Sequence, residues 1–186
     1  MMGAFHGGPF VEVFSAQGSK SEGSVKKTGA VKKVFDKTAK GWVFELEGGR
    51  DVKMQLPPDG KDSLGLLQNY LVLQVHVPIG KGFSIELAIL DQSKTRRRLN
   101  LSCNNKDLHV TPLHVRAPLN VVRRGVWLNL CLDVAGIFNE TFGPVTRLAE
   151  FWSIESILLS AACKVCNIIY EQHHLLQSTL LKLLFI

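Results

Sequence analysis

Three consecutive arginines, Arg96, Arg97 and Arg98, are the residues of the chain best suited to specific chemistry. A guanidinium group donates paired, charge-assisted hydrogen bonds, so arginine readily contacts carboxylates and phosphates. Any one basic cluster can equally be a solvated sheet surface that discourages edge pairing. Because several such clusters occur, the sequence favours an acidic partner. The candidate contact residues are Arg96, Arg97, Arg98, Arg123, Arg124, Lys32 and Lys33.

The cysteines form at most half of a metal site. Cys163 and Cys166 have the C-x-x-C spacing, but a structural zinc ion needs four ligands, and the adjacent pair His173 and His174 is poorly placed to supply two. On a strand, residues three apart face opposite sides of the sheet. We therefore interpret the two cysteines as ordinary core or half-buried thiols and expect no metal or cofactor.

Catalytic motifs are also lacking in the sequence. It contains no G-x-S-x-G, no H-E-x-x-H and no P-loop. Asp133 and Glu140 are too isolated to indicate a pair of catalytic carboxylates. We expect no enzymatic activity and no small-molecule substrate.

Alternation of hydrophobic and polar residues predicts an all-β protein. The clearest element is a hairpin of residues 83–89 and 95–103, in which Arg96 and Arg98 share one face and Arg97 lies on the other. Strands at a spacing of roughly 8–12 residues, separated by Gly/Pro turns, indicate an antiparallel β-sandwich of jelly-roll type. Further strands are predicted at residues 10–14, 42–46, 52–56, 70–77, 126–134, 154–160 and 163–170, and loops at 18–28 and 136–144.

The C-terminal end has a different pattern. Its leucines at positions 176, 180, 183 and 184 have helical spacing, and leucine favours helix over strand. We therefore predict a β-sandwich domain over residues 1–170, followed by a leucine-rich segment, 171–186, that forms a short C-terminal helix or is loosely ordered.

The composition agrees with one basic, folded domain. The 186 residues are 46% hydrophobic, and 22 Lys and Arg outnumber 16 Asp and Glu, for a formal net charge of +6 at pH 7. No run of about 18 apolar residues occurs, so we expect no membrane span. The N-terminal residues do not resemble a signal peptide, so the four cysteines indicate reduced thiols in the cytosol or nucleus.

Four passages together resemble the family of cilia- and flagella-associated protein 20. They are GPFVEVFSAQG at residues 8–18, LGLL leading into YLVLQV at 64–75, FSIEL continuing to Arg97, Arg98 and Leu99 at 83–99, and WLNLCLD at 127–133. The similarity covers about residues 5–170 and decreases after about Cys166. Larger relatives continue into a long tail, so we expect the chain to be a truncated or alternatively spliced form.

The resemblance implies a jelly-roll β-sandwich and a non-enzymatic role in cilia. The founding member of the family lies inside doublet microtubules at their inner junction, so the implied partners are tubulin, microtubules and axonemal junction proteins. The implied location is the cilium and axoneme, and the cytoplasm. Residues 96–98 resemble a basic stretch of the family, which supports them as candidate contacts.

Two other functions stay open from the sequence. Members of the same family have also been linked to nuclear, RNA-related roles, so the protein could be a nuclear, nucleic-acid-associated protein that uses the same arginines. Trp127 faces away from the aliphatic side of its predicted strand and could stack on a sugar, although we favour its burial.

Overall fold

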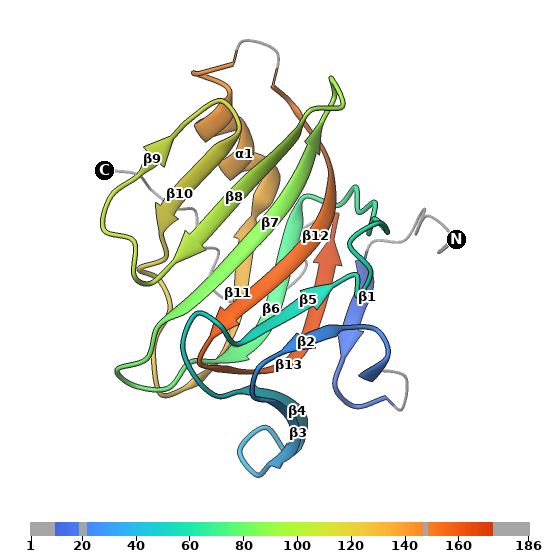
Figure 1. Cartoon of the computed structure of the whole chain (residues 1–186), viewed down its shortest axis with the longest axis vertical. Coiled ribbons are helices and arrows are strands. Elements are labelled where there is room, and N and C mark those ends of the chain that lie inside the picture. Colours follow the sequence, from blue (N-terminus) through green and yellow to red (C-terminus); the bar gives the residue numbers. More distant parts are fainter. Residues whose placement is uncertain (1–9, 19–21, 147–148, 173–186) are drawn as a thin grey trace.

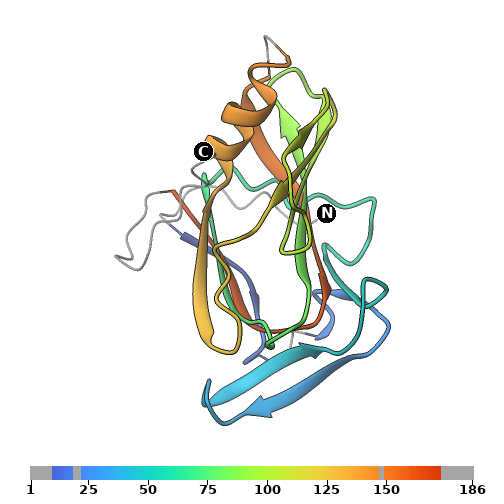
Figure 2. The same ribbon diagram turned by 90° about the vertical axis from the view of Figure 1, so that its left-hand side faces the viewer.

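Two β-sheets pack face to face in the computed structural model, which describes residues 10–18, 22–146 and 149–172. Figure 2 shows the two layers nearly edge-on, with helix α1 (Val134–Phe142) at one end. The predicted all-β sandwich is therefore confirmed. No helix in this part of the chain is long and apolar enough to cross a membrane.

The first sheet has six strands. Its order is β11-β6-β13-β4-β3, and β1 also pairs with β13 (Figure 1). The strands are β1 (Phe10–Ser15), β3 (Val31–Asp36), β4 (Gly41–Leu46), β6 (Tyr70–His76), β11 (Trp127–Asp133) and β13 (Cys163–Glu171).

The second sheet has seven strands in the order β2-β5-β12-β7-β8-β10-β9. The predicted hairpin is confirmed as β7 paired antiparallel with β8, whereas β10 pairs parallel with β8, so the sheet is mixed. The strands are β2 (Lys26–Thr28), β5 (Lys53–Leu56), β7 (Phe83–Asp91), β8 (Arg96–Ser102), β9 (His109–Val110), β10 (His114–Pro118) and β12 (Phe151–Ala161).

The hydrophobic core fills the space between the sheets. Along β7, Phe83, Ile85 and Leu87 are fully buried, whereas Ser84 and Glu86 on the opposite face are only half-buried. This is the period of two expected of a strand with one face on the core. The last two strands, β12 and β13, both occur as predicted but lie in different sheets. The chain passes from one sheet to the other at Ala161 and Ala162, where Ala161 has a φ of 74°.

Helix α1 corrects one prediction, because residues 136–144 were expected to form a loop. Asp133 caps the helix by accepting a hydrogen bond of 2.8 Å from the backbone N–H of Gly136. Ile137, Phe138 and Phe142 then form a buried stripe at helical spacing. Gly136 and the aromatic residues have low helix propensity, and burial of this stripe overrides it.

Two further predictions concern the loop at residues 18–28 and the C-terminal segment. The predicted loop at residues 18–28 contains the short strand β2 at its end, where Lys26–Thr28 pair with β5. The predicted C-terminal helix lies outside the described residues, and the division at residue 170 stays a prediction.

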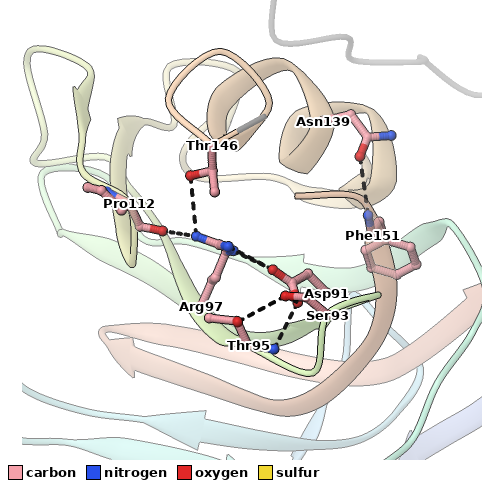
Figure 3. A network of polar contacts seen from close by, with 8 residues as sticks. All are labelled: Asp91, Ser93, Thr95, Arg97, Pro112, Asn139, Thr146 and Phe151. Carbon is pink, nitrogen blue, oxygen red and sulfur yellow. Dashed lines mark hydrogen bonds and ion pairs between the residues drawn. The ribbon is translucent and has the colours of Figure 1, made fainter. Parts of the chain in front are cut away.

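A buried ion pair joins the β7–β8 hairpin to its neighbours (Figure 3). Arg97 points into the protein, where its Nε and Nη2 donate to one carboxylate oxygen of Asp91 at 2.9 and 2.7 Å. The same guanidinium donates to the carbonyl of Pro112, before β10, and to the hydroxyl of Thr146, after α1. Its Cζ lies 5.5 Å from the centre of the Phe142 ring. One side chain therefore connects β8, the β9–β10 connection and the end of the helix.

The acidic partner of this pair is fully satisfied. Burial alone would raise the pKa of the Asp91 carboxyl. Hydrogen bonds from the Ser93 hydroxyl, the Thr95 backbone N–H and Arg97 have a larger opposite effect, so the pKa lies below its ordinary value. The side chain of Asp91 is 0% exposed and that of Arg97 is 5% exposed. Such a pair stays charged because each charge has its partner inside the protein.

A second ion pair joins the turn of the β3–β4 hairpin to β13 of the same sheet. Asp36 accepts hydrogen bonds from the backbone N–H groups of Thr38 and Ala39 in the hairpin turn, both at 2.9 Å. Its other carboxylate oxygen lies 2.9 Å from the ammonium group of Lys164 on β13. The pKa of Asp36 is lowered to about 2. The hydrogen bond from the backbone N–H of Ala39 has the largest effect, burial opposes it, and Lys164 adds to it.

We expect Arg97→Met to lower the free energy of unfolding by about 3–5 kcal/mol, because removal of one partner leaves the buried Asp91 without its counter-charge. Urea denaturation at pH 7 measures this change. Arg98→Met is the matched control on the same strand. Because the side chain of Arg98 is 60% exposed, its loss should cost less than about 1 kcal/mol. Equal losses from the two variants would contradict the structural role of Arg97.

Asp36→Asn tests the charge of Asp36 while it leaves an oxygen to cap the turn. Because the pKa of Asp36 is lower in the folded protein than in the unfolded chain, its charge stabilises the fold above about pH 4, and this stabilisation is lost as the pH falls towards 2. We expect the variant to be about 1–2 kcal/mol less stable at pH 6 and nearly equal to the wild type at pH 2. Urea denaturation across this range measures the difference, with Asp51→Asn, at an exposed position, as the control. A difference independent of pH would argue against the ion pair.

Candidate functional site

A polar groove of about 560 Å³ lies on the outer face of the seven-stranded sheet. Its lining comes from β5, β7, β8, β10 and β12, from the turn before β5 and from the loop after β8. The charged lining residues are Arg50, Lys53, Arg98, Arg116 and Glu86, and the other polar ones are His114, Asn100, Asn105, Ser84, Ser102 and Ser160.

The strand register brings these residues together. Arg98 on β8 lies beside His114 on β10, and Asn100 lies between Arg116 and Glu86. Along another row, Lys53 is opposite Ser160, which is opposite Ser84. Directly opposed side chains on one face of an antiparallel pair are about 4.5–5.5 Å apart at Cβ. The parallel strand β10 continues the same face beside β8, so these rows form a continuous surface.

The shape of the groove follows from side-chain length. Ser84 and Ser160 lie on the central strands β7 and β12, and their hydroxyl oxygens are 2.6 Å apart. Longer basic side chains stand on either side, with Lys53 on β5 and Arg98 on β8. Short side chains in the middle and long ones at the sides leave a trough whose rims carry positive charge.

The electrostatics of the groove favour an anionic ligand. Four of its lining residues are arginine or lysine and one, Glu86, is a carboxylate. The guanidinium Nη1 of Arg98 lies 3.8 Å from a carboxylate oxygen of Glu86, but both side chains are substantially exposed. An exposed pair of this kind is weak, so a carboxylate of a partner can replace Glu86 at little cost.

The three consecutive arginines do not act as one cluster. Arg98 lines the groove, and Arg96 is exposed on the same face of β8. The prediction that Arg97 contacts a partner must be corrected, because this residue is buried in the ion pair with Asp91. Its alternation with Arg96 and Arg98 was predicted correctly.

The other predicted basic residues lie outside the groove lining. Arg123 and Arg124 are exposed in the connection between β10 and β11. Burial raises the pKa of the Cys103 thiol, and Arg124 opposes this shift only in part. Lys32 and Lys33 lie on β3 of the other sheet, where the ammonium of Lys32 is 3.2 Å from Glu47 and that of Lys33 is 3.2 Å from the Gly18 carbonyl.

Five charged or titratable groove residues were not among the predicted contact residues: Arg50, Lys53, Glu86, His114 and Arg116. Residues 114–117 do alternate, since His114 and Arg116 are exposed and Val115 and Ala117 are buried. This signal is only four residues long and is flanked by Pro112 and Pro118, so it did not indicate a strand. The parallel pairing that places it beside β8 has no local signature.

The cysteines and Trp127 occupy less specialised positions. Cys163 is buried, which raises the pKa of its thiol far above the usual range, and the Sγ of Cys166 accepts a hydrogen bond from the Gln17 amide at 3.3 Å. Within the described ranges, no group of three or more His, Cys, Asp or Glu side chains could hold a metal ion. Trp127 is half-buried on the outer face of the six-stranded sheet, with its ring centre 5.7 Å from that of His76.

Comparisons with known proteins identify a family, and distant structural likenesses are among the matches. The solved structure of the CBM22-1 and GH10 modules of endo-1,4-beta-D-xylanase 10B from Clostridium thermocellum, complexed with xylohexaose, matches 88% of this chain and 29% of its own length, at 10% identity and a TM-score of 0.46. The model of the CFA20 domain matches residues 1–183. This match extends beyond Cys166, near which the similarity noted in the sequence decreases. It confirms the resemblance drawn from the four passages, and the chain belongs to the CFA20 domain family, whose name associates it with cilia and flagella.

Proposed function

We propose that the protein is a non-enzymatic structural module of cilia and flagella that binds axonemal microtubules or their junction proteins through the groove. The observation that carries the proposal is the groove itself, where Arg50, Lys53, Arg98 and Arg116 surround a floor of small hydroxyl side chains. Tubulin surfaces are acidic, so the sign of the charge is complementary. Membership of the CFA20 domain family supports the ciliary setting.

The position of the groove on a paired sheet also suits a protein partner. It lies on a sheet whose strands are held by regular pairing, so the basic side chains stand on a rigid base. Charged residues presented in this way guide the approach of a partner and fix its register on the surface. Their contribution to affinity decreases when salt screens them. The screening length is about 8 Å at physiological ionic strength. The proposed location is accordingly the axoneme, with a cytoplasmic pool of the unbound protein.

Co-sedimentation with microtubules at physiological salt tests the proposal. We expect the wild-type chain to bind, and Arg98→Glu combined with Arg116→Glu to weaken binding at least about tenfold, because both reversals place acids on the rim of the groove. The matched control is Arg123→Glu combined with Arg124→Glu, which makes the same change of charge outside the groove lining. The control should bind nearly as well as the wild type.

Two outcomes would contradict the proposal. If the wild-type protein stays in the supernatant, microtubule binding is ruled out. If both double variants lose the same affinity for microtubules, net charge rather than the groove determines binding. The nuclear alternative is tested in the same titration with single-stranded RNA. Tighter binding of RNA than of microtubules, with a steep dependence on salt, would favour that alternative.

A further inference from the structure

Two neighbouring loops at one end of the sandwich each expose an apolar side chain. The first loop, residues 77–82, joins β6 to β7, and the second, residues 119–126, joins β10 to β11, at the lower left of Figure 1. Ile79 in the first loop is 81% exposed, and Val126 at the end of the second is 50% exposed. Val126 lies two residues before Leu128, so it continues the core face of β11 beyond the end of the core. The two side chains form a small apolar tip outside the packed interior.

Hydrogen bonding and packing hold the two loops together. The N–H of Gly125 donates to the carbonyl of Val77 at 2.7 Å, which continues the pairing of β11 with β6. A Cβ atom added at Gly125 would lie 2.9 Å from Cγ1 of Ile79, so this side chain lies directly against the second loop. Leu119 and Val122 of the second loop are buried in the core. Apolar groups on such fixed loops lose little conformational entropy when a partner covers them.

The charges beside the tip are positive and uncompensated. The two loops together contain Lys81, Arg123 and Arg124, all exposed, and no carboxylate. No carboxylate of the described residues lies within 4.0 Å of any of the three. Arg124 lies beside the thiol of Cys103, and burial raises the pKa of this thiol. The thiol is therefore neutral at pH 7 and leaves the charge of Arg124 in place.

Two further loops at this end of the molecule add no net charge. The turn 47–52 lies near the first loop, because residues 161 and 162 bond to the carbonyls of Val52 and Gly82, and the side chain of Asn104 lies against Gly82. Glu47 is 3.2 Å from its own partner, Lys32. The remaining charged residues are one base and one acid in each loop: Arg50 with Asp51, and Lys106 with Asp107. The positive excess at this end therefore belongs to the tip.

A group with one net negative charge lies on the outer face of the six-stranded sheet. Asp36 and Glu45 are 2.9 and 3.4 Å from the ammonium of Lys164, which they share. In the register, Glu45, Lys164, His76 and Trp127 follow one another across four strands. Adjacent strands are about 4.8 Å apart, so Glu45 is about 14 Å from the strand that begins at the tip. The group has little effect on the tip, because the screening length is about 8 Å at physiological ionic strength.

We propose that this tip binds the surface of a lipid bilayer with anionic headgroups. The two apolar side chains enter the boundary between headgroups and acyl chains, and the three basic side chains lie among the headgroups. Ile79 projects from the protein, and a bilayer can surround a projecting side chain, whereas a protein partner would need a complementary pocket. Apolar contact and attraction to anionic lipid are both needed, because either signal alone is small. The tip is separate from the groove, whose lining contains none of its residues.

Flotation of the full chain with lipid vesicles at physiological salt tests the proposal. We expect binding to phosphatidylcholine vesicles that contain about 30% phosphatidylserine, and at least about tenfold weaker binding to phosphatidylcholine alone. Ile79→Ser combined with Val126→Ser, and Arg123→Glu combined with Arg124→Glu, should each weaken binding to the anionic vesicles at least about tenfold. All four positions are exposed, so these substitutions leave the core intact.

Matched controls change exposed residues elsewhere. Leu113→Ser removes an exposed apolar side chain between β9 and β10, and Arg98→Glu combined with Arg116→Glu makes the same change of charge in the groove. Both controls should bind the anionic vesicles nearly as well as the wild type. Loss of binding in either control to the same extent as in the tip variants would overturn the proposal.

Insertion of the tip is measured by tryptophan fluorescence. The emission that Ile79→Trp adds to that of the wild type should shift to shorter wavelength with anionic vesicles, because the indole leaves water. Leu113→Trp should show no such shift. An acidic protein as the true occupant predicts no binding to either kind of vesicle, which would refute the proposal. Equal binding to neutral and anionic vesicles, or binding without the shift, would refute it as well.

Discussion

The ion pair between Arg97 and Asp91 determines which way the side chains of β8 point. Asp91 is buried, and a buried charge without its partner costs several kcal/mol. Arg97 must therefore face inward to reach Asp91, and Pro112 and Thr146 accept its remaining hydrogen bonds. Because side chains alternate along a strand, Arg96 and Arg98 must then face outward. A slip of one residue would bury two arginines and expose Leu99. The basic side of the groove on this strand thus depends on an interaction on the opposite face.

The groove is assembled from segments that are far apart in the chain. Arg50 and Lys53 belong to the first third of the sequence, Arg98 and Arg116 to the middle, and Ser160 to the last strand of its sheet. The sheet order brings β5, β12, β7, β8 and β10 side by side. No single basic cluster of the sequence corresponds to the groove, since Arg97, Lys32 and Lys33 all lie elsewhere. Burial and pairing, rather than adjacency in the chain, select which charges act together.

Strands with long alternation could be predicted from the sequence, whereas β3, which lacks alternation, and the short strands β2, β9 and β10 could not. Residues 83–89, 95–103 and 126–134 alternate over many positions and became β7, β8 and β11. The strands β2, β9 and β10 have only two to five residues, and they form because neighbouring strands supply hydrogen bonds and burial. For the same reason helix α1 was missed, since its weak propensity is outweighed by burial of Phe138 and Phe142. The groove needed the register, which local patterns do not contain.

The positive surface of the molecule results from the way its acids are used. Asp91 is bound to Arg97, Asp36 and Glu45 share Lys164, and Asp133 caps a helix. Glu155 accepts hydrogen bonds from the hydroxyls of Ser63 and Ser153. The carboxylates of Asp91, Asp36 and Glu45 lie beside a cation, which cancels part of their field at the surface. With 22 Lys and Arg against 16 Asp and Glu, an excess of bases remains on the surface. The groove, with four basic residues and one carboxylate in its lining, has the charge to prefer an acidic partner.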